Sequence, residues 1–509
     1  MLLSLALSTF LIAHHRQQPL PPPSSVRIVD VIPKSLSGET NQDSEPSLAI
    51  GKAGKGKWLA ISAFTPDPAG GELAPLYVSD DGGATWNLNC VIPGGGDVGT
   101  SDVTIGFGTG SDLYITDLRG RQPFGHVFLD VIKLADFRSV DPAIDLRPGQ
   151  LREQVDQPAV VVASTTTDGV ATNRLFIGLN DFSAAQGHTS TIDFADQPIF
   201  RLETRNTSSQ DGPEVRVATI DSGWTYAAFY RWINKNDPRE DGNTRINGEV
   251  VVRRDNTFGN DAHPFSQLVG KDGKSGISAA PKLSVVWGAN IGSQRIGGSL
   301  ALAIDPRKPA DPEMPNVVYL AYGSDNGKDS SPYQLHLCRS TDGGKSWTEI
   351  TGIPHTANAV NASIAVTTSG IVGFLYQSFD SNSRTWSTYL YRQSDSASDS
   401  EPLLLSQFSE STTPNIRDPQ NNKFFHPYLG DYAALSTYGD SFLGVFCAGN
   451  QAKLANFPLV KDLNQVFSRN FDPITGSMTD IHRNPIKDAK TNRSVSGLSI
   501  DPFFFRIDN

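Results

Sequence analysis

Acidic side chains stand just before a series of short apolar runs in this 509-residue chain. With a histidine and a tyrosine in similar places, the group comprises Glu45, Asp102, Asp156, Asp211, Glu214, His426, Asp431 and Tyr432. If the fold brings such carboxylates together, their mutual repulsion raises some of their pKa values, as a general acid requires. Cleavage of a glycosidic bond needs two carboxylates at a suitable separation. The pattern therefore predicts acid–base chemistry where these runs begin.

A second group of polar and aromatic residues follows later apolar runs, and comprises Asp67, Asp117, Arg119, Arg121, Arg231, Trp232, Asp325 and Asp380. Arginine binds a carboxylate through two parallel hydrogen bonds, and tryptophan offers an apolar platform to a sugar ring. We assign catalysis to Asp431, Tyr432, Glu214 and Asp67. We assign substrate binding to Arg119, Arg121, Arg231, Trp232, Glu45, Asp102, Asp156, Asp211 and His426.

The same pattern has a structural interpretation. A polar residue before an inner strand can hydrogen-bond backbone amides of the neighbouring sheet, and one such role repeated along the chain produces the same spacing. For each single carboxylate, both interpretations stay open.

A repeated sequence pattern indicates the elements that position these residues. It consists of a polar residue, a short alternating apolar strand, a turn with Gly or Asp, and a second apolar strand. We count seven such units, which begin near residues 44, 101, 156, 211, 298, 361 and 430. The 46 glycines and 33 prolines favour short strands and turns over long helices. We predict an all-β propeller of four-stranded antiparallel blades with seven repeat units, and a six-bladed ring is the alternative.

In a propeller the first strand of each blade lines the axis, so the residues just before it gather at one mouth of the channel. The loops between second and third strands open on the same face, which unites the two groups of candidate residues. The ring needs a completed last blade. Either residues 26–29 or residues 502–507 could supply its closing strand.

An eight-residue turn occurs twice, at residues 79–86 and 340–347. Its Asp can accept hydrogen bonds from the amides ahead of it, and its glycines can adopt the positive φ of a tight reversal. Its Trp supplies an apolar plate that wedges between neighbouring sheets. The defining positions are held by Ser79, Asp81, Gly83, Thr85 and Trp86 in the first copy and by Ser340, Asp342, Gly344, Ser346 and Trp347 in the second.

Both copies resemble the Asp-box, or BNR repeat, of the sialidase-like β-propeller superfamily. The resemblance spans roughly residues 40–470. It implies that the turns join third to fourth strands, on the face away from the site. A retaining sialidase further implies three arginines that clamp a carboxylate, a tyrosine that attacks beside a glutamate, and an aspartate acid/base. The Phe-Arg-Ile-Pro motif of sialidases is absent, because residues 26–29 keep only its Arg-Ile, and no arginine triad is assigned.

We therefore predict an extracytoplasmic protein that acts on or binds glycans, as a glycoside hydrolase of the exo-sialidase-like type with carboxylates and a tyrosine at the channel mouth. The alternative is a non-catalytic propeller scaffold that binds a protein or polysaccharide partner at the same mouth.

The net charge of −11 argues against nucleic acid or an anionic membrane surface as the main partner. No cofactor is expected, apart from Ca²⁺ held loosely by the carboxylate ring, and a monomer is expected. Residues 1–25 combine an apolar run, too short to span a bilayer, with a Pro-rich stretch. We interpret them as a signal peptide and linker of a secreted or periplasmic protein, and residues 26–509 as one propeller domain with an irregular C-terminal tail. Cys338 and Cys447 are expected in the core.

Overall fold

The computed structural model of the chain describes residues 20–32, 44–64, 74–91, 100–121, 126–139, 144–146, 152–167, 170–181, 189–193, 200–204, 215–220, 224–238, 244–291, 294–296, 299–308, 316–325, 333–394, 401–409, 429–467, 471–472, 477–478, 484 and 500–509. These residues contain no α-helix. Their helical segments are short 3₁₀ turns: η1 (Lys52–Gly54), η3 (Leu454–Asn456) and η4 (Leu463–Gln465).

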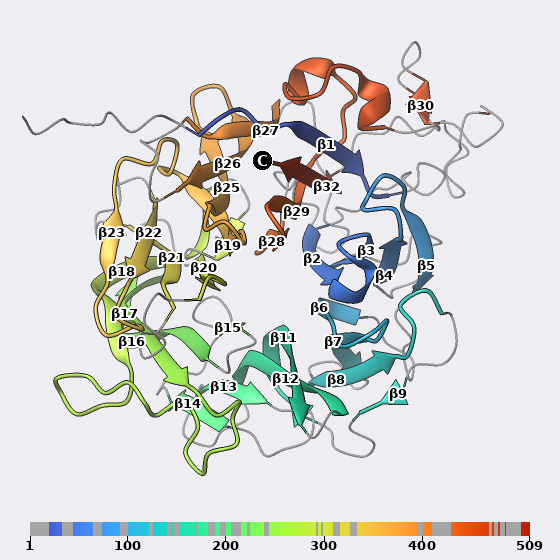
Figure 1. The fold of residues 1–509 in the computed structure, drawn as a ribbon. Helices are drawn as coiled ribbons and strands as arrows, with labels where there is room; N and C mark the ends of the chain where they lie inside the picture. Colours follow the sequence, from blue (N-terminus) through green and yellow to red (C-terminus); the bar gives the residue numbers. More distant parts are fainter. Residues whose placement is uncertain are drawn as a thin grey trace, which may run out of the picture.

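Seven antiparallel sheets of the described residues stand as blades around a central axis (Figure 1). Blades 1 to 3 are formed by β2 (Ser44–Gly51), β3 (Trp58–Phe64), β4 (Pro75–Ser79) and β5 (Asn87–Val91); by β6 (Thr100–Phe107), β7 (Leu113–Arg121), β8 (His126–Leu134), β9 (Ile144–Asp145) and β10 (Arg152–Glu153); and by β11 (Val155–Thr167), β12 (Val170–Asp181), β13 (Thr189–Asp193) and β14 (Phe200–Thr204).

Blades 4 to 6 are formed by β15 (Arg216–Thr219), β16 (Thr225–Pro238), β17 (Thr244–Asp255), β18 (Ile277–Ile291) and β19 (Gln294–Ile296); by β20 (Leu300–Ile304), β21 (Val318–Ser324), β22 (Gln334–Ser340) and β23 (Thr348–Ile350); and by β24 (Ala359–Val366), β25 (Val372–Asp380), β26 (Thr385–Gln393) and β27 (Leu403–Ser409). Together with blade 7 they confirm the count of seven units and exclude the six-bladed alternative. A separate short hairpin pairs β30 (Phe471–Asp472) with β31 (Ser477–Met478).

Blade 7 closes the ring with strands from both ends of the chain. From the axis outward its order is β28 (Ala434–Tyr438), β29 (Ser441–Gly449), β32 (Ile500–Asp508) and β1 (Ser25–Asp30). Ser25 of β1 pairs with Asp508 of β32, and the two strands run antiparallel. Both segments considered for closure therefore contribute, β32 as the third strand and β1 as the outermost one.

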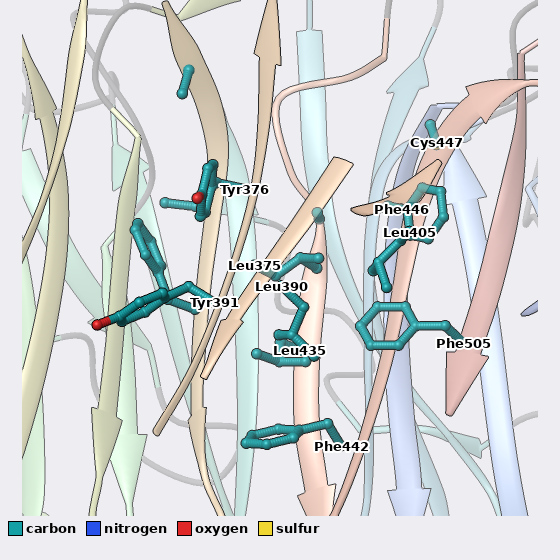
Figure 2. Close-up of a cluster of buried hydrophobic side chains, with 14 of the residues drawn as sticks. Leu375, Tyr376, Leu390, Tyr391, Leu405, Leu435, Phe442, Phe446, Cys447 and Phe505 are labelled. Atoms are coloured by element: carbon teal, nitrogen blue, oxygen red, sulfur yellow. The ribbon is translucent and has the colours of Figure 1, made fainter. Parts of the chain in front are cut away.

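Apolar side chains pack between neighbouring blades, because alternate residues of each strand face opposite blades. Figure 2 shows this at one junction, where Leu375, Leu390 and Leu405 of blade 6 lie beside Leu435, Phe442, Phe446 and Phe505 of blade 7. Burial of each such side chain stabilises the fold by about 1.5–3 kcal/mol. Cys447 is buried in this cluster, and Cys338 is buried between blades 4 and 5, which confirms the core positions expected for both.

The inner strands are tied to one another by side-chain hydroxyl groups. At four junctions, a hydroxyl of one blade accepts a hydrogen bond from a backbone amide of the next blade. These bonds run from Ile105 N to Ser47 Oγ (3.1 Å), from Val160 N to Thr104 Oγ1 (3.0 Å), from Asn361 N to Ser299 Oγ (3.1 Å) and from Leu435 N to Ser363 Oγ (2.9 Å). This is the kind of bond that the structural interpretation of the sequence expects, made here by hydroxyl groups.

The repeated turn forms twice with the same hydrogen bonds. Asp81 Oδ1 accepts from the amides of Ala84 (2.8 Å) and Thr85 (3.0 Å), and Asp342 Oδ1 accepts from the equivalent amides in the second copy. The two glycines of each copy have positive φ, between 73° and 88°. Both turns join a third to a fourth strand, as the resemblance implied.

Each turn also contacts the preceding blade. Trp86 packs edge-on against Phe504 of blade 7 at 5.1 Å between ring centroids, and a Cβ atom added at Gly83 would lie 2.0 Å from the same ring. Trp347 packs against the apolar cluster between blades 4 and 5. The amide of Gly82 donates to Lys57 O, beside η1, so the first turn lies at the end of blade 1 opposite the channel mouth.

Replacing Asp81 with Ala should destabilise the fold by about 1–2 kcal/mol, because several donors of the turn lose their acceptor. Burial alone would raise the pKa of Asp81, but hydrogen bonds from Thr85, Ser79 and Ala84 outweigh it and lower the pKa below its ordinary 3.8. The carboxylate therefore stabilises the folded state above that pH, and its contribution is lost on further acidification. Urea unfolding at pH 7 measures the effect. Asp80→Ala, in the neighbouring exposed position, is the control; equal losses in both variants would contradict the assignment.

Candidate functional site

The mouth ends of the inner strands carry a repeated β-bulge. The pairing of first and second strands shifts between Ser44 and Ser47, Thr100 and Val103, Asp156 and Ala159, and Val360 and Ser363. Within three of these bulges a residue other than glycine has positive φ, namely Glu45 (56°), Gln157 (54°) and Asn361 (57°). Such a backbone costs about 1–3 kcal/mol and is common next to functional sites, where a bulge re-aims side chains.

Tyr432 and Asp102 meet at this end of the channel. Tyr432 precedes β28 of blade 7, Asp102 lies in the bulge of β6 in blade 2, and 330 residues separate them in the chain. Tyr432 Oη donates a hydrogen bond of 2.9 Å to Asp102 Oδ2. Since blade 1 stands between the two blades, this bond reaches across the start of an inner strand. It brings a predicted catalytic residue and a predicted binding residue into one site.

A third blade contributes a cation. Arg216 is the first residue of β15 in blade 4, and its guanidinium carbon lies 5.5 Å from the centroid of the Tyr432 ring. Its Nε donates to Leu300 O of blade 5 at 3.0 Å, which fixes the side chain between two inner strands. Arg216 is not among the residues selected from the sequence. The signal was present, because a charged residue interrupts the apolar inner strand formed by residues 215–218.

This arrangement favours an activated phenol. The Asp102 carboxylate can take the phenolic proton, and a guanidinium against the ring stabilises the negative charge that then develops on Tyr432. Asp102 and Tyr432 are 7% and 8% exposed, so the pair is shielded from bulk water and its electrostatic interactions are strengthened.

Arg119 belongs to a buried ionic cluster in blade 2. Its Nε lies 2.7 Å from Asp117 Oδ2 and 2.7 Å from Asp130 Oδ2. Burial raises the pKa of Asp117 to about 6 against the opposing attraction of Arg119, and the charge of Asp130 adds to the rise. Asp117 Oδ1 is buried without a hydrogen-bond partner, which leaves one oxygen of this carboxyl group unsatisfied.

Arg231 is likewise compensated locally. It lies on β16 in blade 4, and its Nη1 is 2.9 Å from Glu249 Oε1 on the neighbouring strand. Its Nη2 donates to Ser275 O at 3.2 Å. Of the arginines selected from the sequence, the structure describes the side chains of Arg119 and Arg231. Both are paired with carboxylates.

Three further selected carboxylates are described. Glu45 is 2% exposed and packs so closely against Gly430 that a Cβ atom there would lie 2.3 Å from the Glu45 amide nitrogen. Asp156 Oδ1 accepts a hydrogen bond from Gln157 N at 3.1 Å. Asp431 is partly buried beside Tyr432 in the chain. The contact with Gly430 joins the start of blade 1 to the segment that carries Tyr432.

The other selected residues lie outside what the structure describes. Asp67, Asp211, Glu214 and His426 are not among the described residues, and neither are the side chains of Arg121 and Trp232. In the described part of the chain, no group of three or more His, Cys, Asp or Glu side chains could hold a metal ion. No helix in that part is long and apolar enough to cross a membrane.

No family model matches the chain, and neither does any curated protein. Solved structures with a related arrangement include the α-L-arabinofuranosidase Arb93A from Fusarium graminearum, with 12% identity and a TM-score of 0.43 over 69% of this chain and 92% of that one. An α-L-arabinanase from Penicillium chrysogenum has 11% identity and a TM-score of 0.40, over 83% and 94%. A protein of unknown function from Dyadobacter fermentans has 11% identity and a TM-score of 0.37, over 96% and 100%. Similarity of this degree does not bear on the activity of this chain.

The buried Asp117 carboxyl group should make stability depend on pH. Its pKa is about 6 in the folded protein against an ordinary 3.8, so between roughly pH 4 and 6 the folded state holds a proton that the unfolded chain has released. Its contribution to the free energy of unfolding therefore rises as pH falls through this window, by on the order of 1–3 kcal/mol. Thermal melts from pH 7 to 5 should show wild type gaining stability relative to Asp117→Asn. Asp145→Asn, at an exposed carboxylate of the same blade, is the control, and parallel curves for wild type and Asp117→Asn would exclude this assignment.

Proposed function

We propose that the channel mouth is a glycan site and that the protein is a glycoside hydrolase with Tyr432, Asp102 and Arg216 at its reactive centre. The observation that carries the proposal is the 2.9 Å bond from Tyr432 Oη to Asp102 Oδ2, with the Arg216 guanidinium 5.5 Å from the ring centroid. A nucleophile, a base and a charge-stabilising group thus come together from three blades. The proposal includes the extracytoplasmic location expected from the N-terminal sequence.

In the proposed reaction, Tyr432 Oη attacks the anomeric carbon while Asp102 takes the phenolic proton. The bond from that carbon to the leaving oxygen breaks, and a carboxylic acid protonates the leaving oxygen; Asp431, Glu214 and Asp67 are the proposed acids. Water then attacks the anomeric carbon, giving its proton to the same carboxylate, and Asp102 returns a proton to the departing Tyr432. Two displacements at one carbon retain its configuration.

The charges favour a neutral sugar over an anionic one. Glu45, Asp102, Asp156 and Asp431 belong to the mouth ends of their blades, whereas Arg119 and Arg231 are paired with carboxylates of their own sheets. Arg216 is the cation that the proposal places at the reactive centre, and these four carboxylates outnumber it. Like-charge contacts of this kind disfavour a sialoside carboxylate and are a strong source of specificity. We therefore propose a neutral glycan as the substrate.

A second candidate is a binding propeller without catalysis. It is favoured by the burial of both Tyr432 and Asp102, since a pair that only ties blade 7 to blade 2 would be covered in the same way. In that case the mouth recognises a polysaccharide or protein, and the Tyr–Asp bond shapes it.

Replacing Tyr432 with Phe should lower kcat on a neutral fluorogenic glycoside by at least about 100-fold, because the nucleophilic oxygen is removed while the ring remains. Asp102→Asn should cause a comparable loss, because an amide cannot take the phenolic proton. An array of neutral fluorogenic furanosides and pyranosides, with one sialoside, identifies the substrate on the wild-type protein. The sialoside should be the poorest of them.

Tyr438→Phe is the matched control. Tyr438 ends the strand β28 that follows Tyr432 and lies against Gly56 of blade 1, away from the mouth, so its activity should equal that of wild type. Full activity in Tyr432→Phe would remove this residue from the reaction. A wild-type protein that cleaves no glycoside but binds immobilised glycans would establish the second candidate.

A further inference from the structure

A serine, a histidine and a glutamate form a hydrogen-bonded series in blade 5, on strands other than the inner strands that surround the channel. His336 Nε2 lies 3.0 Å from Ser324 Oγ, and His336 Nδ1 lies 2.7 Å from Glu349 Oε1. The three residues come from β21, β22 and β23, which are neighbours in the sheet and in Figure 1. His336 pairs with Tyr322 and Glu349 with Cys338 in the strand register, so the side chains share one face of the blade.

The partners of the two His336 ring nitrogens determine which nitrogen donates a hydrogen bond and which accepts one. An ionised carboxylate only accepts hydrogen bonds, so Nδ1 carries the proton that bonds to Glu349. In the neutral imidazole, Nε2 is then the acceptor, and it faces the Ser324 hydroxyl. This is the arrangement in which a base activates a nucleophile and a third group orients the base.

The surroundings hold the histidine and leave its edge accessible. The His336 ring stacks on the Tyr322 ring, with 4.8 Å between centroids and 17° between planes. The side chains of His336 and Glu349 are 21% and 45% exposed, whereas Ser324 is 6% exposed. A reactant must therefore approach from the more exposed side of His336, and because Ser324 is largely buried, a small acyl group needs the least rearrangement to reach it.

The thiol and the phenol beside His336 do not compete with Ser324 as the nucleophile. Cys338 lies on the same face, but burial raises the pKa of its thiol to about 12, and the Glu349 charge adds to the rise. Burial likewise raises the pKa of the Tyr322 phenol. Both groups stay protonated at neutral pH, and Ser324 is the group with a base within hydrogen-bond distance.

We propose that Ser324, His336 and Glu349 form a second active site, which hydrolyses esters of short carboxylic acids. Ser324 Oγ attacks the ester carbonyl carbon while its proton passes to His336 Nε2. The tetrahedral adduct expels the alcohol, which leaves with that proton, and an acyl-Ser324 ester remains. Water then attacks the acyl carbon, gives a proton to His336, and displaces Ser324, which regains the proton as the carboxylic acid departs. Glu349 acts through His336 and is a positioning residue.

Two measurements on the 509-residue chain test this site. The first is covalent labelling by a fluorophosphonate, in which a serine oxygen displaces fluoride from phosphorus, with the labelled residue located by mass spectrometry. The second is hydrolysis of p-nitrophenyl acetate compared with p-nitrophenyl octanoate. We expect labelling at Ser324, faster hydrolysis of the acetate, and loss of both reactions in Ser324→Ala. His336→Gln should react at least about 100-fold more slowly, and Glu349→Asp should label faster than Glu349→Gln.

Matched controls separate the triad from general effects of substitution. Ser387→Ala changes a partly buried strand serine of blade 6, and His263→Ala changes an exposed histidine of blade 4; both should react like wild type. Thermal melts establish that each variant is folded. A folded wild-type protein that is not labelled at Ser324, or that hydrolyses the acetate no faster than Ser324→Ala, would overturn the proposal and leave the three residues as a structural hydrogen-bond network. Preference for the octanoate would overturn the assignment to short acyl groups.

Discussion

The ring depends on how its inner strands are satisfied. Each blade ends toward the axis in an edge strand, whose free backbone groups would otherwise lie buried at considerable cost. Four hydroxyl groups satisfy some of these backbone groups, because each accepts a hydrogen bond from a backbone amide of the next blade. They belong to Ser47, Thr104, Ser299 and Ser363. Because each bond joins a particular hydroxyl to a particular amide, it fixes the height of one blade relative to its neighbour. These bonds therefore determine how the residues at the channel mouth are placed relative to one another.

Because the blades are held at fixed heights relative to one another, residues from different blades can meet in one site. Tyr432 and Asp102 belong to blades on either side of blade 1, and Arg216 comes from blade 4. A shift of β28 by one residue would reverse the faces of its side chains and move Tyr432, two residues before the strand, away from Asp102, because strand side chains alternate. The bulges at Glu45, Gln157 and Asn361 add strained backbone at this end. That strain is tolerated because the packed interfaces between blades hold the inner strands in place.

Much of the architecture could be predicted from the sequence, because its signals are local. Alternation of apolar residues gave seven units, and the paired Asp-Gly-Gly turns carried their own hydrogen-bond acceptor and positive-φ residues. Closure was different: β1 and β32 are at opposite ends of the chain, and no local signal shows that both enter one blade. The contact between Tyr432 and Asp102 likewise has no local signal in the sequence. Each residue was selected, but their pairing depends on a bulge and on the register of three blades, neither of which periodicity reveals.

The need to balance buried charge explains why the arginines in the sequence indicated the position of the site less well than Tyr432 and Asp102. A guanidinium buried in a sheet is costly unless a carboxylate offsets it. Arg119 and Arg231 obey this rule through partners on the same or the adjacent strand. Such pairs arise wherever the fold needs them, so an arginine near the mouth does not by itself indicate a ligand. Arg216 differs in that its guanidinium lies against the face of Tyr432, while its Nε donates to a carbonyl of the next blade. A cation held against a phenol that already donates to a carboxylate stabilises charge on the phenol oxygen. This contact connects the packing of the blades to the reaction that we propose at the channel mouth.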